Sequence, residues 1–190
     1  TQFETNKTGN SSRTLALVLL AVLLLGLGAA FYFLVDNLRI PRDNSPEVIF
    51  TRDMMAHHAQ AVEMATLIRD RSTDEELRQL TLDMILTQQN QIGQMQAWLN
   101  LWNVPQEGLE PPMGGTGEMM GMAPQQSVND LTTLPITEAE ISFLQLMIRH
   151  HEGGVFMAQD VLETRQGVVK RLAESIVAAQ SGEIEYMESL

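Results

Sequence analysis

The first strong pattern along the chain is an unbroken apolar run near its start. Residues 14–35 read TLALVLLAVLLLGLGAAFYFLV and contain no charged side chain. As a helix that rises about 1.5 Å per residue, this run is roughly 33 Å long, enough to cross a hydrocarbon core of about 30 Å. We therefore expect a transmembrane helix over 14–35, preceded by a cytoplasmic tail over 1–13 and followed by a linker over 36–46.

A cleaved signal peptide is the alternative to this anchor. Gly28 and Ala30 are small enough for a cleavage site. The apolar run continues past Ala30 as far as Val35, however, and this favours an uncleaved anchor. Basic residues flank the run on both sides, so charge alone does not decide its orientation. The short tail and the signal-like span favour a single-pass membrane protein with a cytoplasmic N-terminus and a periplasmic or extracellular C-terminal domain.

After the linker, apolar residues recur every three or four positions, which is the pattern of amphipathic helices. The pattern predicts a first helical hairpin over 47–102, with helices from about Pro46 to Arg71 and onward to about Trp102. A second hairpin is predicted over 137–190. Between them, residues 103–136 are rich in proline, glycine and methionine, and we expect a long, poorly ordered crossover loop there.

Polar turn residues mark where the helices of each hairpin begin and end. Ser72 or Thr73 is the predicted N-cap of the second helix. Thr137 and Glu140 have the spacing of a capping box that opens the third helix, and Gly167 is placed to end that helix. The turns within each hairpin are short, so its two helices should be antiparallel.

The two hairpins are copies of one repeat. Around the histidines, the order Phe, Met, Met or Ile, His, His, Ala or Gly, Met, Ala recurs 93 positions later, so that His57 corresponds to His150. Further on, Gln88 corresponds to Gln180 at a spacing of 92. A duplicated hairpin predicts an all-α protein, in which four helices form a bundle with approximate two-fold symmetry.

Composition and spacing exclude several classes of function. The net charge of -12 argues against a nucleic-acid partner, and the absence of cysteine excludes disulfides, thiolate metal sites and cysteine nucleophiles. No glutamate lies three residues before a histidine, as di-iron bundles require. Asp53 and Glu152 are not repeated between the copies, so solvated faces explain them better than zinc hydrolysis does. We therefore expect that the protein is not an enzyme.

The paired histidines are the candidate chemistry. Adjacent helical residues point about 100° apart, so we expect one histidine of each pair to face inward and the other to lie at a flank. Imidazole with thioether is a soft ligand set that favours Cu(I). The alternative is that these side chains are ordinary core, with Gln88, Gln91, Gln180 and Glu183 as their polar neighbours. The predicted metal ligands are His57, His58, His150, His151, Met54, Met64, Met147 and Met157.

The crossover offers a second candidate. The segment PPMGGTGEMMGMAP contains Met113, Met119, Met120 and Met122. Flexible methionine clusters can bind Cu(I) through thioethers alone. A linker that happens to contain methionine is the alternative.

These residues resemble the bacterial "domain of unknown function 305" family. The resemblance lies in Met54-Met55-x-His57-His58-x-x-Ala61-x-x-Met64-Ala65, in Met147-Ile148-x-His150-His151-x-Gly153-Gly154-x-x-Met157-Ala158, and in Gln180-x-x-Glu183-Ile184-x-x-Met187. It implies a ferritin-like four-helix bundle, exported or membrane-anchored, and in some members copper binding and tolerance. The chain departs from the pattern at Gln91, where the family would have glutamate, and at Glu152.

Two functions follow as hypotheses. The first is an extracytoplasmic protein that binds copper(I) for buffering, delivery or tolerance. The second is a non-catalytic accessory subunit of a larger membrane complex, for example a respiratory one. In both cases the predicted partner of the anchor is membrane lipid, and small residues such as Gly26 and Gly28 would permit close contact with partner helices.

Overall fold

The protein is described by a computed structural model that covers residues 9–37 and 40–190. The chain divides into two compact units, Thr1–Ile40 and Pro41–Leu190. Within the described residues the secondary structure is helical and contains no strand, which confirms the all-α class. Most of the predicted tail over 1–13 lies outside the described residues, and so does part of the predicted linker over 36–46.

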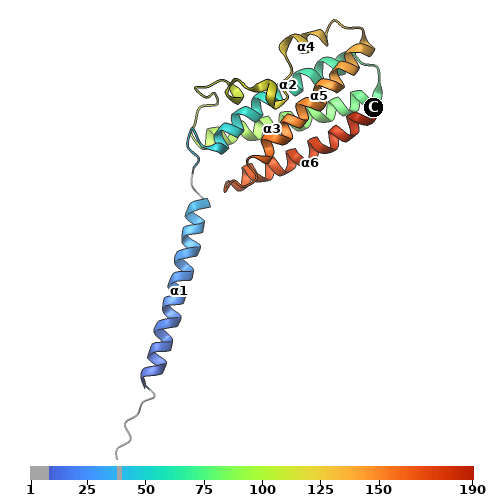
Figure 1. Cartoon of the computed structure of the whole chain (residues 1–190). Helices are drawn as coiled ribbons and strands as arrows, with labels where there is room; N and C mark the ends of the chain where they lie inside the picture. Colours follow the sequence, from blue (N-terminus) through green and yellow to red (C-terminus); the bar gives the residue numbers. More distant parts are fainter. Residues whose placement is uncertain (1–8, 38–39) are drawn as a thin grey trace, which may run out of the picture. The chain divides into compact units, whose positions relative to one another are not determined.

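The first unit consists of one long helix, α1 (Gly9–Asn37) (Figure 1). Its segment Arg13–Leu34 has a mean hydropathy of 2.6, and its side chains are exposed. Among the described residues, this is the one helix long and apolar enough to cross a membrane, and a signal sequence would meet the same criterion. The helix is therefore either a membrane anchor or a signal sequence.

The second unit is built on four long helices, α2 (Pro46–Arg71), α3 (Glu75–Leu101), α5 (Ile136–Gln159) and α6 (Gly167–Ser189). Helix α2 packs against α3, α5 packs against α6, and α2 and α5 join the two hairpins (Figure 1). The bounds of α2 are the ones that the apolar pattern predicts. The ferritin-like detail of the predicted bundle stays a prediction.

The start of α3 differs from the prediction. Asp74 is the N-cap, and its Oδ1 accepts a hydrogen bond from the Leu77 amide at 2.8 Å. Neither Ser72 nor Thr73 caps the helix, because the Ser72 hydroxyl instead donates to Glu140 Oε1 at 2.5 Å. A long-range bond between the two hairpins therefore outcompetes the local capping role.

The predicted ends of the third helix were also wrong. Helix α5 begins directly after Pro135, whose extended backbone takes the N-cap position without a side-chain bond, so Thr137 already lies in the first turn. The helix ends at Gln159, and the chain leaves it through a turn at 160–163. Gly167 does not terminate α5; it is the first residue of α6.

The crossover between the hairpins is structured, which contradicts the expectation of poor order. It forms two 3-10 helices, η1 (Pro112–Gly115) and η2 (Gly117–Met120), and a short α-helix, α4 (Gln125–Asp130). Buried residues along it, including Val128 and Leu131, join the apolar core of the bundle. The crossover is ordered because it buries apolar side chains against α2 and α5.

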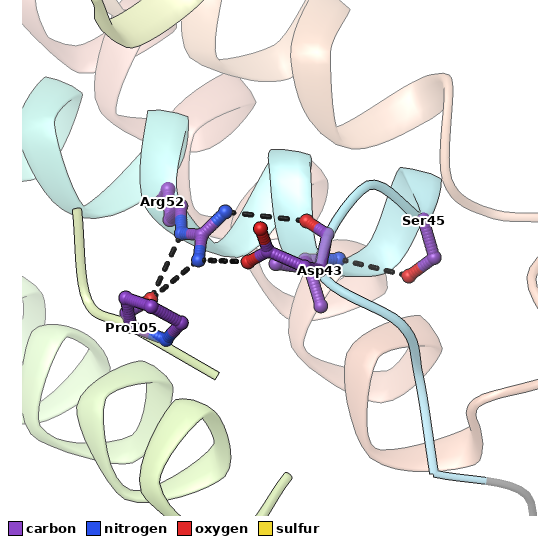
Figure 2. Close-up of polar contacts among 5 residues, drawn as sticks. Asp43, Ser45, Arg52 and Pro105 are labelled. Carbon is purple, nitrogen blue, oxygen red and sulfur yellow. Dashed lines mark hydrogen bonds and ion pairs between the residues drawn. The ribbon is translucent and has the colours of Figure 1, made fainter. Parts of the chain in front are cut away.

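Arg52 fixes the beginning of the crossover to the segment that precedes α2 (Figure 2). Its guanidinium donates from Nε to the Pro105 carbonyl oxygen at 3.0 Å, and it pairs with Asp43 Oδ1 at 2.5 Å. Ser45 caps α2 in the same region, with Pro46 in the first turn. One arginine thus positions both the entry to α2 and the exit from α3.

The buried core falls into two apolar clusters. We call them the upper cluster and the lower cluster, by their position along α2. The upper cluster joins the C-terminal half of α2 to the N-terminal half of α5, and the lower cluster joins the opposite halves. The upper cluster contains Ala61, Met64, Ala65, Ile68, Leu77, Leu80, Met84, Phe143, Leu146, Met147 and Met187, among others. The lower cluster contains Phe50, Met54, Met95, Met113, Met157, Ala158, Val161, Val169, Leu172, Ala173 and Ile176.

Candidate metal centre

The histidine pairs lie where each helix passes from one apolar cluster to the other. All four side chains are fully buried, with 0% of their surface exposed. One histidine of each pair faces the α2–α5 interface and the other lies at a flank of its helix. The flank of α2 faces α3 and the flank of α5 faces α6, so the second histidine of each pair is covered by the neighbouring helix. We call the four side chains the histidine layer.

His57 and His150 are the inward members of their pairs. Their ring centroids are 3.6 Å apart, with the ring planes inclined by 31°. Within each pair the rings are further apart, at 6.4 Å for His57 and His58 and 6.3 Å for His150 and His151. The α2–α5 interface therefore brings together one imidazole from each copy of the repeat.

The flanking histidines each bind a polar residue on the neighbouring helix. His58 Nε2 lies 2.6 Å from Gln91 Oε1 on α3, and His151 Nε2 lies 2.6 Å from Glu183 Oε2 on α6. These contacts occupy corresponding positions of the repeat. The partner is a neutral amide in the first copy and a carboxylate in the second, so the two halves of the layer differ in charge.

Burial keeps three of the rings neutral. Removal from water lowers the pKa of His57 from 6.5 to about 3, with the neighbouring His58 as a smaller cause. The same loss of hydration lowers the pKa of His58 to about 4, against the opposing effect of the hydrogen bond that His58 donates to Gln91 Oε1. It also holds the pKa of His150 well below 6.5. Neutral imidazole is the form that can bind a metal ion.

The rings present lone pairs that no protein group uses. Nε2 of His57, His58 and His151 faces an oxygen acceptor and so carries a proton, and in the neutral rings of His57 and His58 this leaves the lone pair on Nδ1. All three Nδ1 atoms are buried without a protein hydrogen-bond partner, and both ring nitrogens of His150 are as well. The buried amides of Gln88 and Gln180 also lack protein partners.

Unpartnered buried nitrogens point to a ligand. Each one costs about 1–3 kcal/mol if it is left unsatisfied, so such atoms are rare in folded proteins. A soft cation would use the imidazole lone pairs directly. The residues present therefore fit a metal ion, with nitrogen donors from His57 and His150. The described residues contain no group of three or more His, Cys, Asp or Glu side chains arranged to hold a metal, so the thioethers beside the histidine layer are candidates for further donors.

The four predicted methionine ligands are buried and divide evenly between the two apolar clusters. Met54 and Met157 belong to the lower cluster, and Met64 and Met147 belong to the upper one. On each helix one methionine precedes the histidine pair and the other follows it. The thioethers therefore belong to the apolar regions on both sides of the histidine layer.

The crossover closes the outer side of the layer, which the sequence interpretation missed. The Met120 carbonyl oxygen accepts from His57 Nε2 at 3.1 Å. A Cβ at Gly153 would overlap this carbonyl group, and a Cβ at Gly121 would overlap the Arg149 carbonyl oxygen. The adjacent glycines Gly153 and Gly154 within an otherwise regular helix were the signal, because each costs a helix about 1 kcal/mol relative to alanine.

Two side chains of α2 anchor the crossover on either side of Met120. The Gln60 amide makes two bonds to the backbone of Ala123, at 2.9 and 2.7 Å. Asp53 Oδ1 accepts from the Met113 amide at 2.8 Å. Asp53 was expected on a solvated face. It is instead half-buried beneath the crossover, and the loss of hydration raises its pKa.

A groove of about 640 Å³ approaches the layer between α3 and α6. Gln91 lines it together with Trp98, Arg171 and Leu172. Because the same Gln91 holds His58, the groove leads to the outer partner of a buried imidazole. The groove is lined by both polar and apolar residues of α3 and α6.

The comparisons with known proteins agree with this geometry. The family model described as "Domain of unknown function (DUF305)" matches residues 47–190. A putative secreted DUF305 protein from Streptomyces coelicolor is 46% identical over 77% of this chain and 91% of its own, with a TM-score of 0.72. A DUF305 fragment from Deinococcus radiodurans is 44% identical over 78% and 97%, also with a TM-score of 0.72.

A third similar structure is CopM in its Cu(I)-bound form. It is 25% identical over 76% of this chain and 94% of its own, with a TM-score of 0.63. No curated protein matches the chain.

Acid should destabilise the metal-free protein between about pH 6.5 and pH 4. The unfolded chain binds protons on His57 and His58 below about 6.5, whereas the folded protein excludes them until about pH 3 to 4. The unfolded state thus binds more protons in this window, so the free energy of unfolding decreases as the pH is lowered. We expect a loss on the order of 1 kcal/mol per pH unit for each histidine. Urea unfolding followed by circular dichroism measures it. Ordinary carboxyl groups titrate below about pH 5. An unfolding free energy that stays constant from pH 7 to pH 5 would therefore show that the rings are hydrated.

Gly153→Ala should loosen the crossover. The new methyl group would displace the Met120 carbonyl, and overpacking of this kind costs about 1–3 kcal/mol. Faster hydrogen exchange of the crossover amides and a lower free energy of unfolding would show it. Gly182→Ala is the matched control, because its Cβ meets no atom within 4 Å and should stabilise α6 by up to about 1 kcal/mol. Equal effects of the two substitutions would contradict the close packing at Gly153.

Proposed function

This chain belongs to the DUF305 family, and from that premise we propose that it is a membrane-anchored, non-catalytic protein that binds copper(I). The observation that carries the proposal is the set of buried imidazole lone pairs without a protein partner around His57 and His150. Binding at this position would serve copper buffering, delivery or tolerance outside the cytoplasm.

The donor chemistry supports Cu(I) over harder ions. Neutral imidazole and thioether are soft donors, whereas Mg²⁺ and Ca²⁺ require oxygen ligands. The Glu183 carboxylate is already bound to His151, and the interior on both sides of the histidine layer is apolar. Copper(I) is a soft, singly charged ion that binds nitrogen and sulfur donors in preference to water oxygen, so a buried site with these donors suits it.

The related structures add support from the same fold. CopM, which is 25% identical to this chain, was solved in a Cu(I)-bound form. This likeness supports a metal-binding role for the fold, and the particular residues proposed here rest on the geometry of this chain.

The proposed roles of the site residues differ. His57 and His150 would supply nitrogen donors across the α2–α5 interface, with thioethers from Met54, Met64, Met147 and Met157 as neighbouring donors. His58 and His151 would complete the set, each held in one tautomer by its oxygen partner. The four imidazoles are fully buried inside the helical unit, which leaves no open position beside them for a substrate. Storage or transfer of an ion is therefore a better fit than catalysis.

We place the copper-binding unit outside the cytoplasm. Helix α1 would cross the membrane once, with residues 1–13 in the cytoplasm and the helical unit in the periplasm or outside the cell. Its apolar segment Arg13–Leu34 has the necessary length, and the similar Streptomyces coelicolor protein is described as a putative secreted protein.

The topology can be tested with single cysteines, because the chain has none. Thr133→Cys, at an exposed position of the helical unit, should react with a membrane-impermeant maleimide in intact cells. Asn6→Cys should react only after the cells are permeabilised, and it serves as the matched control. Labelling of Asn6→Cys in intact cells would reverse the topology. Release of the labelled helical unit from the membrane would identify the apolar segment as a cleaved signal.

Copper binding can be tested by competition titration of the reduced full-length protein in detergent against a chromophoric Cu(I) chelator. The double substitution His57→Leu with His150→Leu should weaken the tightest site at least tenfold, which corresponds to about 1.4 kcal/mol. Met84→Leu with Met95→Leu is the matched control, because both methionines are fully buried in the same core and neither is a proposed ligand. Its affinity should equal that of the wild type.

Absence of tight binding to the wild-type protein would overturn the copper proposal. The alternative of an accessory subunit would then be the one to pursue, through co-purification of a stoichiometric membrane partner. Equal loss in the histidine variant and the methionine control would instead show that packing, not ligation, governs affinity.

A further inference from the structure

The crossover forms a hollow on the protein surface that is separate from the histidine layer. It encloses about 580 Å³ above Ala56 of α2, and the crossover segment from Pro112 to Pro124 supplies the rest of its wall. Three of the side chains that line it are methionines, namely Met113, Met119 and Met122, and one is acidic, Glu118. The hollow thus presents three thioethers and one carboxylate in a lining that otherwise consists of small residues and proline.

We propose that this hollow is a second, surface-accessible site for a soft monovalent cation such as Cu(I) or Ag(I), which Met113, Met119 and Met122 bind through their sulfur atoms. Three thioethers are a sufficient set for these ions, which accept low coordination numbers and prefer sulfur. Hard divalent ions would find only one carboxylate there and so would not compete.

The backbone holds two of the methionines in place before any ion arrives. Met113 has a positive φ of 56°, uncommon for a residue with a side chain, and its amide is fixed by Asp53 Oδ1 at 2.8 Å. The Met122 amide donates to the Gly117 carbonyl oxygen at 2.9 Å, which closes the loop between them. The turn therefore sets the starting positions of both side chains.

Gly117 lets these two side chains converge. A Cβ built on this residue would lie 3.3 Å from Met122 Cγ and 3.9 Å from Met113 Sδ. Both methionines therefore pass over the bare backbone of one glycine. A larger residue would separate them, so the glycine keeps the two side chains close together.

Core packing explains Met113 and Met122 in part, but it does not explain Met119. Met113 and Met122 contact the lower cluster, whereas Met119 is 82% exposed beside the same hollow. An exposed, unbranched thioether on the rim is free to turn inward over a bound ion. The arrangement is that of two placed donors and one mobile donor.

The hollow lies against the segment that caps the histidine layer. Met120, between the two methionines at 119 and 122, presents its carbonyl oxygen to His57 Nε2 at 3.1 Å. An ion captured in the hollow would be separated from His57 by this one backbone segment. The hollow would then act as the loading position for the buried site; this step rests on the proposed function, while the surface site itself does not.

The test is silver titration of the full chain in detergent, with its 12 methionines carrying ¹³C-labelled methyl groups. The methyl resonances of Met113, Met119 and Met122, assigned by single leucine substitutions, should shift with the first equivalents of Ag(I). In equilibrium dialysis, the triple variant M113L/M119L/M122L should bind one equivalent less than wild type. Met55→Leu, a half-buried methionine on α2 that does not line the hollow, should bind the same number.

The outcomes separate this site from the buried one. Unchanged resonances at these three positions, or full stoichiometry in the triple variant, would overturn the surface site. A second outcome is that the triple variant loses one equivalent of silver while the double variant His57→Leu with His150→Leu binds as much as wild type. This outcome would support the surface site and rule out the buried one. Circular dichroism of each variant checks that the helices remain, and once the resonances are assigned, the silver-induced shifts are measured on the wild-type protein itself.

Discussion

Burial of four imidazoles between two apolar clusters is the constraint around which the helical unit is arranged. Loss of hydration keeps the rings of His57, His58 and His150 neutral, and three of the four rings place Nε2 against an oxygen atom. Gln91 and Glu183 supply two of these oxygens from the outer helices, and the Met120 carbonyl supplies a third from the crossover. The register of α3, α6 and the crossover against the two central helices follows from these three contacts. The lone pairs that remain make the same layer suitable for a metal ion.

The repeat produces two similar halves, and the structure makes them unequal. His57 is capped by the crossover, whereas both ring nitrogens of His150 lack a protein partner. A neutral amide holds His58, and a carboxylate holds His151. The second copy also has Gly153 and Gly154 where the first has Gln60 and Ala61: Gly153 admits the crossover against α5, and Gly154 leaves room for Gln180 and His57. Gln60 uses the corresponding position on α2 to bind the crossover backbone instead. One connecting segment therefore requires different residues at equivalent positions of the two copies.

Much of this arrangement follows from the sequence. The three- and four-residue spacing places α2 correctly, the repeat indicates two hairpins, and the shared motif indicates the family. What the sequence did not show depends on contacts between distant segments. Ser72 looks like a cap until Glu140 is known to lie beside it, and Asp53 looks solvated until Met113 lies over it. A composition rich in proline and glycine predicted poor order in the crossover, because it does not reveal how the backbone fits against α5. The pairing of His57 with His150 likewise depends on how α2 and α5 cross, which periodicity within one helix cannot specify.

The contacts that seal the histidine layer also bear on how the protein folds. Gln60 with Ala123, His57 with Met120, and Asp53 with Met113 join residues 60 to 63 positions apart. Closing such long loops costs more chain entropy than forming a hairpin such as α2–α3. Helix α5 contains two adjacent internal glycines, packs against α6 and α2, and contacts the crossover as well. The hairpins can therefore assemble first, and the crossover closes over them late. Until it does, the edge of His57 that the Met120 carbonyl covers is open to solvent, so the last step of folding is also the step that encloses the histidine layer.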